Sequence, residues 1–476
     1  MKVSLASTSE YSSKAAESIS DLNPNAADVL ITSVLTSMVT DLGVVSPTAS
    51  GLLSYYDSNT NSTNTIDGYF VAPEFFNGND HDEHRISMTY GGYVETCKGG
   101  NTFAIPGIYK ILDYVYRNFA SLPLNTLMEY PINIAKEGFT LTQPTKDYFI
   151  HSLEPMFMWH ENSKIVLSEV GKDLDSGIVK LNKLSDTYEH ISNEGFNDFY
   201  VGDVSKSILQ TVQIEGGHAT AADFSKYELI KNNKFNTKYN DLNLTGHSGP
   251  SIGGLMVLKY LDALSSNSEN MMKLLQNVYI DRENNYEFFG NRKEYIGNEI
   301  KKVTQSPSTI QVNTSDDSNN HYSITFSSGY GSGVLCPNTG MYFNNSLGEI
   351  ELNPQGFLGD TKGDRLISNM SPLIIETRDG ITTIGSPGAD RISSAIAQVL
   401  INYSKNNNWQ ESIDKPRFHV NGDGSVRAEP ESLKNQHDIT LTDEYDMYFG
   451  GVCVSGLYND VFSIGDKRRG NVSWKN

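Results

Sequence analysis

Three short stretches of this sequence carry groups that could do chemistry. The first begins at Ser308, which follows Ser306-Pro307 and opens a run of alternating polar and apolar residues. A hydroxyl there could act as a nucleophile if the chain were cut before it, because the freed α-amine would serve as its base. The alternative is an ordinary serine at the start of a strand, which is the more common use of such a residue.

The second stretch, Gly385-Ser386-Pro387-Gly388-Ala389, lies between a short strand-like run and a helix-like run. A turn of this composition can aim successive backbone N–H groups at one point, as an oxyanion hole requires. The alternative is a plain connection between a strand and a helix.

The third stretch, Asp80-His81-Asp82-Glu83-His84, contains side chains of the types that bind metals. It has neither helical nor strand periodicity to fix ligand geometry, so we expect a solvated acidic loop and no metal site. The sequence contains no P-loop, no dinucleotide-binding glycine motif after a strand and no H-E-x-x-H motif. We therefore expect no cofactor.

The elements that would position these groups can be predicted from hydrophobic periodicity. Apolar residues at spacings of three and four predict helices over 26–42 and 108–119, and the helical pattern continues around 145–195 and 203–231. Alternation over 308–314 and 321–328, around the polar stretch 315–320, predicts a β-hairpin. Further strands are expected at 340–344, 373–377, 382–384 and 448–455, with a helix at 391–404. A helical first part and a β-rich second part predict stacked α and β layers.

Composition excludes several classes of protein. The 476 residues carry 37 Lys and Arg against 57 Asp and Glu, a net charge of −20. This balance argues against a nucleic-acid partner and against docking on an anionic membrane. There is no apolar run of transmembrane length and no secretory signal pattern. The cysteines, Cys97, Cys336 and Cys453, are odd in number and far apart, so we expect no disulfide framework and a cytoplasmic location.

Short motifs along nearly the whole chain resemble those of the γ-glutamyltranspeptidase family of N-terminal-nucleophile hydrolases. Each motif alone has low specificity, but a dozen in the family's order form a specific pattern. The similar segments are Asn25–Asp28, Ser46–Gly51, Ile105–Gly107, Glu137–Phe139, Phe199–Gly202, Gly216–Tyr227, Ser251–Gly254, Tyr330–Gly333, Gly340–Asn345, Ser368–Pro372, Gly385–Gly388, Pro416–His419 and Gly450–Gly470.

The resemblance implies an α+β fold, a four-layer αββα sandwich built as one domain. Residues 1–307 would correspond to the mostly helical large subunit and 308–476 to the β-rich small subunit, and the two segments would stay associated after self-cleavage. The freed hydroxyl would attack an amide of a small molecule or peptide. The resulting acyl-enzyme would pass its acyl group to water or to an amine.

The family's nucleophile falls on Ser308, and Thr309 is the second candidate. A rival alignment on Asn319-Asn320-His321 matches other letters of the motif but requires a large deletion in the hairpin and supplies no nucleophile. Ser327 falls on the hydroxyl residue that bonds the nucleophile. Gly388 and Ala389 fall on the two glycines of the oxyanion hole, so the second position carries a Cβ that restricts its backbone.

Recognition of the substrate's head group is where the sequence departs from the family. The arginine that clamps the α-carboxylate is replaced by Tyr69, and the substrate-binding asparagine by Gly329. The other substrate-binding positions fall on Ser346, Glu349, Ser368 and Asn369. Loss of an arginine–carboxylate pair removes about 2–5 kcal/mol of recognition.

We therefore expect an amide hydrolase or acyltransferase with a non-glutamyl acyl donor, acting in peptide or specialised-metabolite biosynthesis. Two alternatives remain open. One is a catalytically inactive relative that serves as a scaffold or binding protein. The other is a true γ-glutamyltransferase that holds glutamate with different residues.

Overall fold

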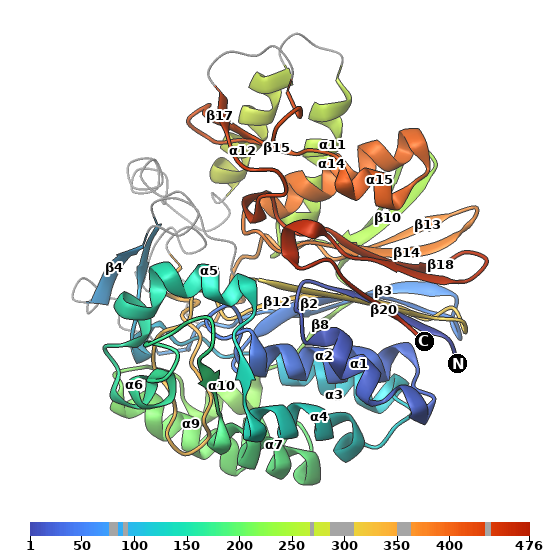
Figure 1. Ribbon diagram of the computed structural model, residues 1–476. Coiled ribbons are helices and arrows are strands. Elements are labelled where there is room, and N and C mark those ends of the chain that lie inside the picture. The colour runs from blue at the N-terminus through green and yellow to red at the C-terminus, as the bar shows by residue number, and fades with distance from the viewer. Residues whose placement is uncertain (76–83, 89–93, 267–270, 286–308, 350–362, 434–438) are drawn as a thin grey trace.

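The computed structural model describes residues 1–75, 84–88, 94–266, 271–285, 309–349, 363–433 and 439–476 (Figure 1). Within this part of the chain, two large sheets lie face to face. The first has the strand order β20-β1-β11-β12-β2-β3-β8 and the second β19-β18-β14-β13-β10-β9. The strands of the first sheet are β1 (Val3–Ser7), β2 (Ser50–Asp57), β3 (Ser62–Gly68), β8 (Ile230–Lys231), β11 (Ile310–Asp316), β12 (His321–Ser327) and β20 (Val472–Lys475). Those of the second are β9 (Lys234–Tyr239), β10 (Leu242–His247), β13 (Leu373–Thr377), β14 (Gly380–Gly385), β18 (Cys453–Leu457) and β19 (Val461–Ile464).

Helices cover the outer face of each sheet, which gives the four-layer αββα sandwich (Figure 1). The layer against the first sheet contains α1 (Ser12–Ser18), α2 (Ala26–Thr40), α3 (Ile108–Phe119), α4 (Leu124–Glu137), α5 (Gln143–Ser152), α6 (Glu161–Leu167), α7 (Asn182–Glu194), α8 (Asp198–Val201), α9 (Asp203–Ile214) and α10 (Ala221–Lys226). The layer against the second contains α11 (Gly253–Ser265), α12 (Met271–Asn285), α14 (Arg391–Asn406) and α15 (Trp409–Asp414). Smaller sheets pair β4 (Arg85–Met88) with β5 (Val94–Cys97), β6 (Phe139–Thr140) with β7 (Ile178–Val179), and β16 (Val426–Ala428) with β15 (Phe418–Val420) and β17 (Ile439–Leu441).

The central hairpin of the first sheet follows from the alternation of its residues. Ile310 pairs with Phe326 and Val312 with Ile324, and all four belong to the apolar core between this sheet and its helices. The intervening residues of β11, Gln311 and Asn313, therefore point to the opposite face, toward the second sheet.

The layer between the two sheets contains many polar side chains that hydrogen-bond across it. Asn313 Nδ2 donates to Cys453 O at 2.6 Å, and Ser323 Oγ donates to Ile384 O at 3.1 Å. Ser54 Oγ reaches Pro372 O at 2.7 Å in the same way. Buried polar groups need such partners, because an unmet hydrogen bond costs roughly 1–3 kcal/mol. The sheets are thus joined in large part by hydrogen bonds.

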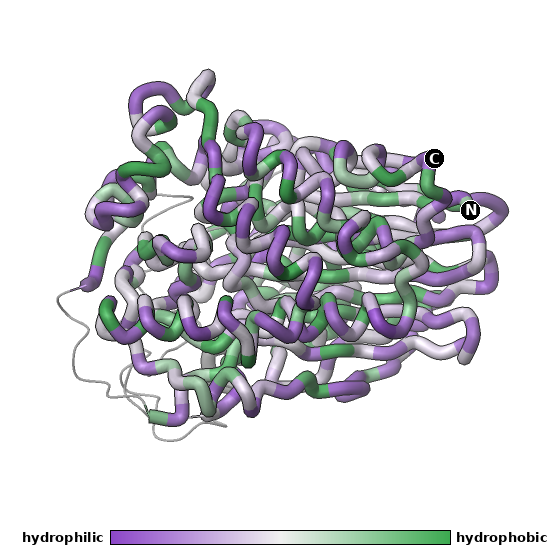
Figure 2. Tube along the Cα trace, turned by 90° about the horizontal axis from the view of Figure 1, so that it is seen from below, coloured by the Kyte–Doolittle hydropathy of each residue, from purple (hydrophilic) through white to green (hydrophobic). Residues whose placement is uncertain are grey.

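Two apolar cores lie on the outer sides of this polar layer. One fills the space between the first sheet and α2, α3, α4 and α7, and the other lies between the second sheet and α11 and α14. Hydrophilic and hydrophobic residues alternate along the helices rather than forming long uniform runs (Figure 2). In the described ranges, no helix combines the length and apolar character needed to cross a membrane.

Several sequence expectations are confirmed. The 26–42 pattern is α2, which Asn25 and Asp28 cap reciprocally. The predicted helix over 391–404 is α14.

Other expectations are wrong. Residues 340–344 form no strand, because their backbone bonds to a neighbouring loop, with Phe343 N donating to Val334 O. The strand expected over 448–455 begins only at Cys453, since Met447–Phe449 form a short 3-10 helix, η7. Strands β1, β2 and β3 were not predicted, and they lie among the helices of the described part of residues 1–307.

Candidate active site

The start of β11 and the end of β12 meet at the end of the sandwich away from both chain termini (Figure 1). Ile310 pairs with Phe326, so one further step of the same register sets Thr309 opposite Ser327. Both are buried, each 5% exposed, and by alternation both share the inter-sheet face with Gln311. Ser308, the nucleophile expected from the motif, lies outside the described residues.

The rival alignment on Asn319-Asn320-His321 is not supported by the position of these residues. They lie at the turn of the hairpin, at the opposite end of the strand pair from Thr309. His321 bonds locally there, to Ser315 Oγ and Asn319 Oδ1. Burial lowers the pKa of His321 to about 3, so the ring is neutral at physiological pH.

The turn after β14 presents two backbone N–H groups with no described acceptor. Gly388 has φ +127° and Ala389 has φ +50°, so both lie in backbone regions that L-residues rarely adopt. Their carbonyls accept from Arg391 N at 2.9 Å and Ile392 N at 3.4 Å. No described protein atom accepts from the N–H of either residue. The geometry therefore allows the turn to act as an oxyanion hole.

Neighbouring groups fix the position of this turn. Ser386 Oγ donates to Pro387 O at 2.8 Å and accepts from Gly451 N at 3.0 Å. Before the turn, Gly385 lies directly against the side chain of Gln311, where an added Cβ would overlap the amide. The oxyanion turn and the start of β11 are therefore neighbours across the inter-sheet layer.

Gly329 follows the end of β12 and lies against the side chain of Glu349. Its N–H donates to Ser327 Oγ at 3.0 Å. A Cβ at Gly329 would overlap Asn345 Oδ1 and Glu349 Oε1, so the carboxylate of Glu349 lies against this backbone. Glu349 and Ser346 are both buried. The predicted positions Ser327, Gly329 and Glu349 thus come together.

An apolar cluster occupies the region of the expected carboxylate clamp. Tyr69 is 3% exposed and packs edge-to-face on Phe70, and the same cluster contains Leu347 and Met370. Leu347 follows Ser346 and Met370 follows Ser368-Asn369, so the cluster gathers the segments of all these predicted positions. Ser368 is hydrogen-bonded to neighbouring backbone N–H groups. Its carbonyl accepts from Ile252 N, and its hydroxyl accepts from Met370 N.

Arg365, which the motifs did not indicate, lies beside Tyr69. Its guanidinium donates to the backbone carbonyls of Tyr69 and Glu228 and to the Tyr227 hydroxyl, and its Nε lies 3.7 Å from Asp67 Oδ1. Burial raises the pKa of Asp67, although the guanidinium opposes this. Arg365 is thus bonded to the protein on several sides. No sequence signal could have found it, since it is 296 positions from Tyr69.

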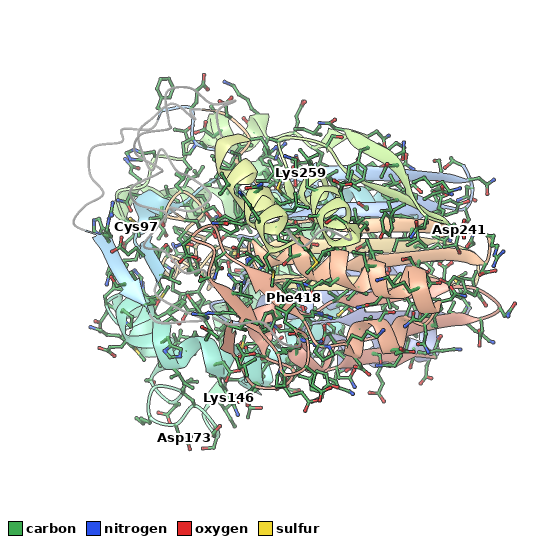
Figure 3. All side chains as sticks on the ribbon, turned by 90° about the horizontal axis from the view of Figure 1, so that it is seen from above. Cys97, Lys146, Asp173, Asp241, Lys259 and Phe418 are labelled. Carbon is green, nitrogen blue, oxygen red and sulfur yellow. The ribbon has the colours of Figure 1, made fainter. Side chains whose placement is uncertain are left out.

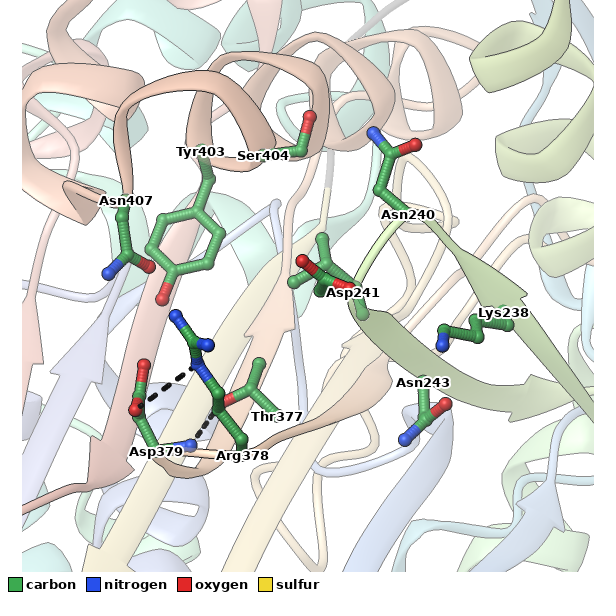
Figure 4. Close-up of a pocket in the computed structure, with 11 residues that line it drawn as sticks. Lys238, Asn240, Asp241, Asn243, Thr377, Arg378, Asp379, Tyr403, Ser404 and Asn407 are labelled. Carbon is green, nitrogen blue, oxygen red and sulfur yellow. Dashed lines mark hydrogen bonds and ion pairs between the residues drawn. The ribbon is translucent and has the colours of Figure 1, made fainter.

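The other candidate sites do not join this region. The expected acidic loop lies outside the described residues except for His84, and within the described part no group of three or more His, Cys, Asp or Glu is placed to hold a metal. A polar cavity of about 560 Å³ lies between Asp241, Arg378 and Asn407 (Figure 4). Figure 3 places Asp241 at the end of the molecule away from Cys97, which belongs to the apolar cluster around Tyr69.

Comparisons with known proteins give a family match and a fold match. The gamma-glutamyltranspeptidase family model matches residues 12–297 and 269–445. The glutathione hydrolase proenzyme of Escherichia coli is 24% identical over 430 residues, 76% of this chain and 71% of its own length. That of Bacillus subtilis subsp. natto is 22% identical over 513 residues, 90% and 86% of the two chains.

Among solved structures, the cephalosporin acylase of Bacillus halodurans has a TM-score of 0.78 at 16% identity. It covers 100% of this chain and 95% of its own. At that identity the likeness supports the fold, and the family match supports a hydrolase or transferase activity. The chain belongs to the gamma-glutamyltranspeptidase family.

Proposed function

We propose that this protein is an amide hydrolase or acyltransferase that cleaves its own chain before Thr309 and uses the Thr309 hydroxyl as nucleophile. The observation that carries the proposal is the hairpin register, in which Thr309 faces Ser327 within the inter-sheet layer. A residue that begins the second segment also owns a free α-amine, which can accept the hydroxyl proton.

In the proposed reaction, Thr309 Oγ1 attacks the substrate's amide carbon while the α-amine takes its proton. The N–H groups of Gly388 and Ala389 stabilise the tetrahedral oxyanion. Collapse breaks the C–N bond and releases an amine that carries the proton away. Water or a second amine then attacks the ester on Thr309, which releases the acyl group and restores the hydroxyl.

The proposed acyl donor is not glutamate. The position of the family's arginine clamp is the buried Tyr69, and the nearby guanidinium of Arg365 is already bonded to protein carbonyls and Asp67. The apolar cluster around Tyr69 favours an acyl chain without an α-carboxylate. A donor of this kind suits a tailoring step in peptide or specialised-metabolite biosynthesis.

The mass of the purified protein tests the proposal. We expect two fragments, residues 1–308 and 309–476. The Thr309→Ala variant should stay uncut, whereas Ser308→Ala should still be cleaved at the same position. A small fragment that begins at Ser308 would reassign the nucleophile to that residue. An intact wild-type chain with no acyl adduct would instead favour the scaffold alternative.

A panel of p-nitroanilides tests the donor. Aliphatic and aromatic acyl anilides should be cleaved faster than the γ-glutamyl anilide. Efficient γ-glutamyl turnover would contradict the donor assignment but leave the nucleophile assignment intact.

A further inference from the structure

Asp390 follows Ala389 directly and stands at the N-cap of α14, yet its side chain caps nothing. An aspartate at this position ordinarily accepts a hydrogen bond from the first turn of the helix. Here its Oδ1 instead lies 2.8 Å from Arg391 Nη1 and its Oδ2 3.6 Å from His419 Nε2. The Asp390 side chain is 3% exposed, so these contacts are shielded from water.

His419 contacts Ser394 through one ring nitrogen and faces Asp390 with the other. Its Nδ1 lies 3.0 Å from Ser394 Oγ, and its Nε2 lies 3.6 Å from Asp390 Oδ2. Both side chains are buried, with His419 1% and Asp390 3% exposed. When the ring is protonated, its Nε2–H faces this carboxylate and the two side chains form an ion pair.

Arg391 connects the same carboxylate to a third element. Its Nε donates to Tyr448 O at 3.2 Å, and its guanidinium stacks on the Tyr448 ring at 4.5 Å from the centroid. Tyr448 lies in η7, next to Gly450, whose backbone approaches Gly388. Asp390 therefore ties the oxyanion turn to β15 through His419 and to η7 through Arg391.

Such an anchor matters because the turn contains Ala389 where a glycine would adopt φ +50° freely. The left-handed region is unfavourable for an L-residue, so the surrounding structure must hold it. We propose that Asp390 is a positioning residue: held between Arg391 and His419, it keeps Ala389 left-handed so that its N–H faces the oxyanion. This inference rests on the proposed function of the turn.

The test measures acylation of the cleaved protein by p-nitrophenyl acetate, an activated ester that needs no knowledge of the natural donor. The burst of nitrophenolate gives the acylation rate constant, and intact mass locates the adduct on the 309–476 fragment. Asp390→Ala should lower the acylation rate constant at saturating ester roughly tenfold, because an alanine without the anchor populates the left-handed backbone about that much less often. The ester concentration at half-saturation should change little.

Two further variants distinguish a positioning role of Asp390 from a general loss of folded structure. Asp390→Asn keeps an acceptor for Arg391 and offers a donor to a neutral His419, so it should retain most of the rate. Ala389→Gly added to Asp390→Ala should restore most of the lost rate, because glycine adopts the left-handed backbone without the anchor. The exposed Asp460→Asn, distant from the turn, is the matched control.

If Asp390→Ala fails to fold or cleave, His419→Phe takes its place, since it removes one anchor and leaves the Asp390–Arg391 pair. Its smaller loss should again be restored by Ala389→Gly. Wild-type rates in both anchor variants, or losses that glycine does not restore, overturn the positioning role alone. A wild-type protein that forms no adduct refutes the proposed function, and this inference with it.

Discussion

Asp41, which directly follows α2, carries a fully buried carboxyl group without a described cation beside it. Ser9 Oγ donates to it at 2.6 Å and Thr40 Oγ1 at 3.1 Å, and Thr142 Oγ1 lies at 3.5 Å. Hydroxyl donors offset only part of the loss of water, and burial raises the pKa of Asp41 from 3.8 to about 7.

The raised pKa makes stability depend on pH in a defined direction. Because folded Asp41 holds its proton more tightly than the unfolded chain, its contribution is fully present below pH 3.8 and is lost as pH rises to about 7. Each pH unit between these values corresponds to about 1.4 kcal/mol, so the loss at pH 8 is roughly 4 kcal/mol.

Asp41→Asn removes the charge and keeps the shape of the side chain. We expect this variant to be more stable than wild type at pH 8 by roughly 4 kcal/mol, with the difference shrinking toward zero near pH 4. Urea unfolding at pH 4.5, 6 and 8, followed by tryptophan fluorescence, measures this difference. Both proteins should carry Thr309→Ala, so that a single uncut chain unfolds.

Ser9→Ala is the opposing control. It removes the shortest hydrogen bond to the ionised carboxylate, so it should destabilise more at pH 8 than at pH 4.5. An Asp41→Asn variant whose advantage does not grow with pH would refute the assignment of a protonated, buried Asp41.

Three further predictions follow from other buried groups. Asn313→Leu should destabilise the protein by about 1–3 kcal/mol in urea unfolding, because Cys453 O loses its partner across the sheets. Burial lowers the pKa of His247 to about 3, so the contribution of this neutral side chain to stability is present above pH 6.5 and is lost as pH falls to 3. The His247→Gln variant should therefore have a lower midpoint pH of acid unfolding than the wild type. Gly385→Ala should displace Gln311 and cost about 1–3 kcal/mol, with slower acylation by p-nitrophenyl acetate.

The fold was predictable where one face of an element is apolar and the other polar. The central hairpin has this pattern, since Ile310 and Val312 alternate with Gln311 and Asn313. Strand β2 was not recognised, because all residues of Ser50–Asp57 are buried and its sequence does not alternate cleanly. Residues 340–344 have strand-like composition, but no strand in the described part of the chain pairs with them along their length.

The site was predictable as a set of segments but not to the single residue. Motif letters cannot decide between Ser308 and Thr309, because a shift of one position changes the face on which a side chain lies, and only strand pairing fixes that face. Contacts such as Arg365 with Tyr69 depend on tertiary structure that local sequence does not encode. The left-handed backbone of Ala389 likewise became visible only in the folded turn.

The strand order also has a consequence for how the two segments could assemble and separate. In the first sheet, β1 from the first segment lies between β20 and β11 from the second, and β2 pairs with β12; in the second sheet, β10 pairs with β13. A chain opened before Thr309 therefore cannot come apart unless both sheets are broken. The two segments would have to be joined in one chain while this interleaved strand pattern forms, but not after it has formed. We expect the cleaved protein to owe its lifetime to slow unfolding, and not to regain its structure once its two pieces have been separated.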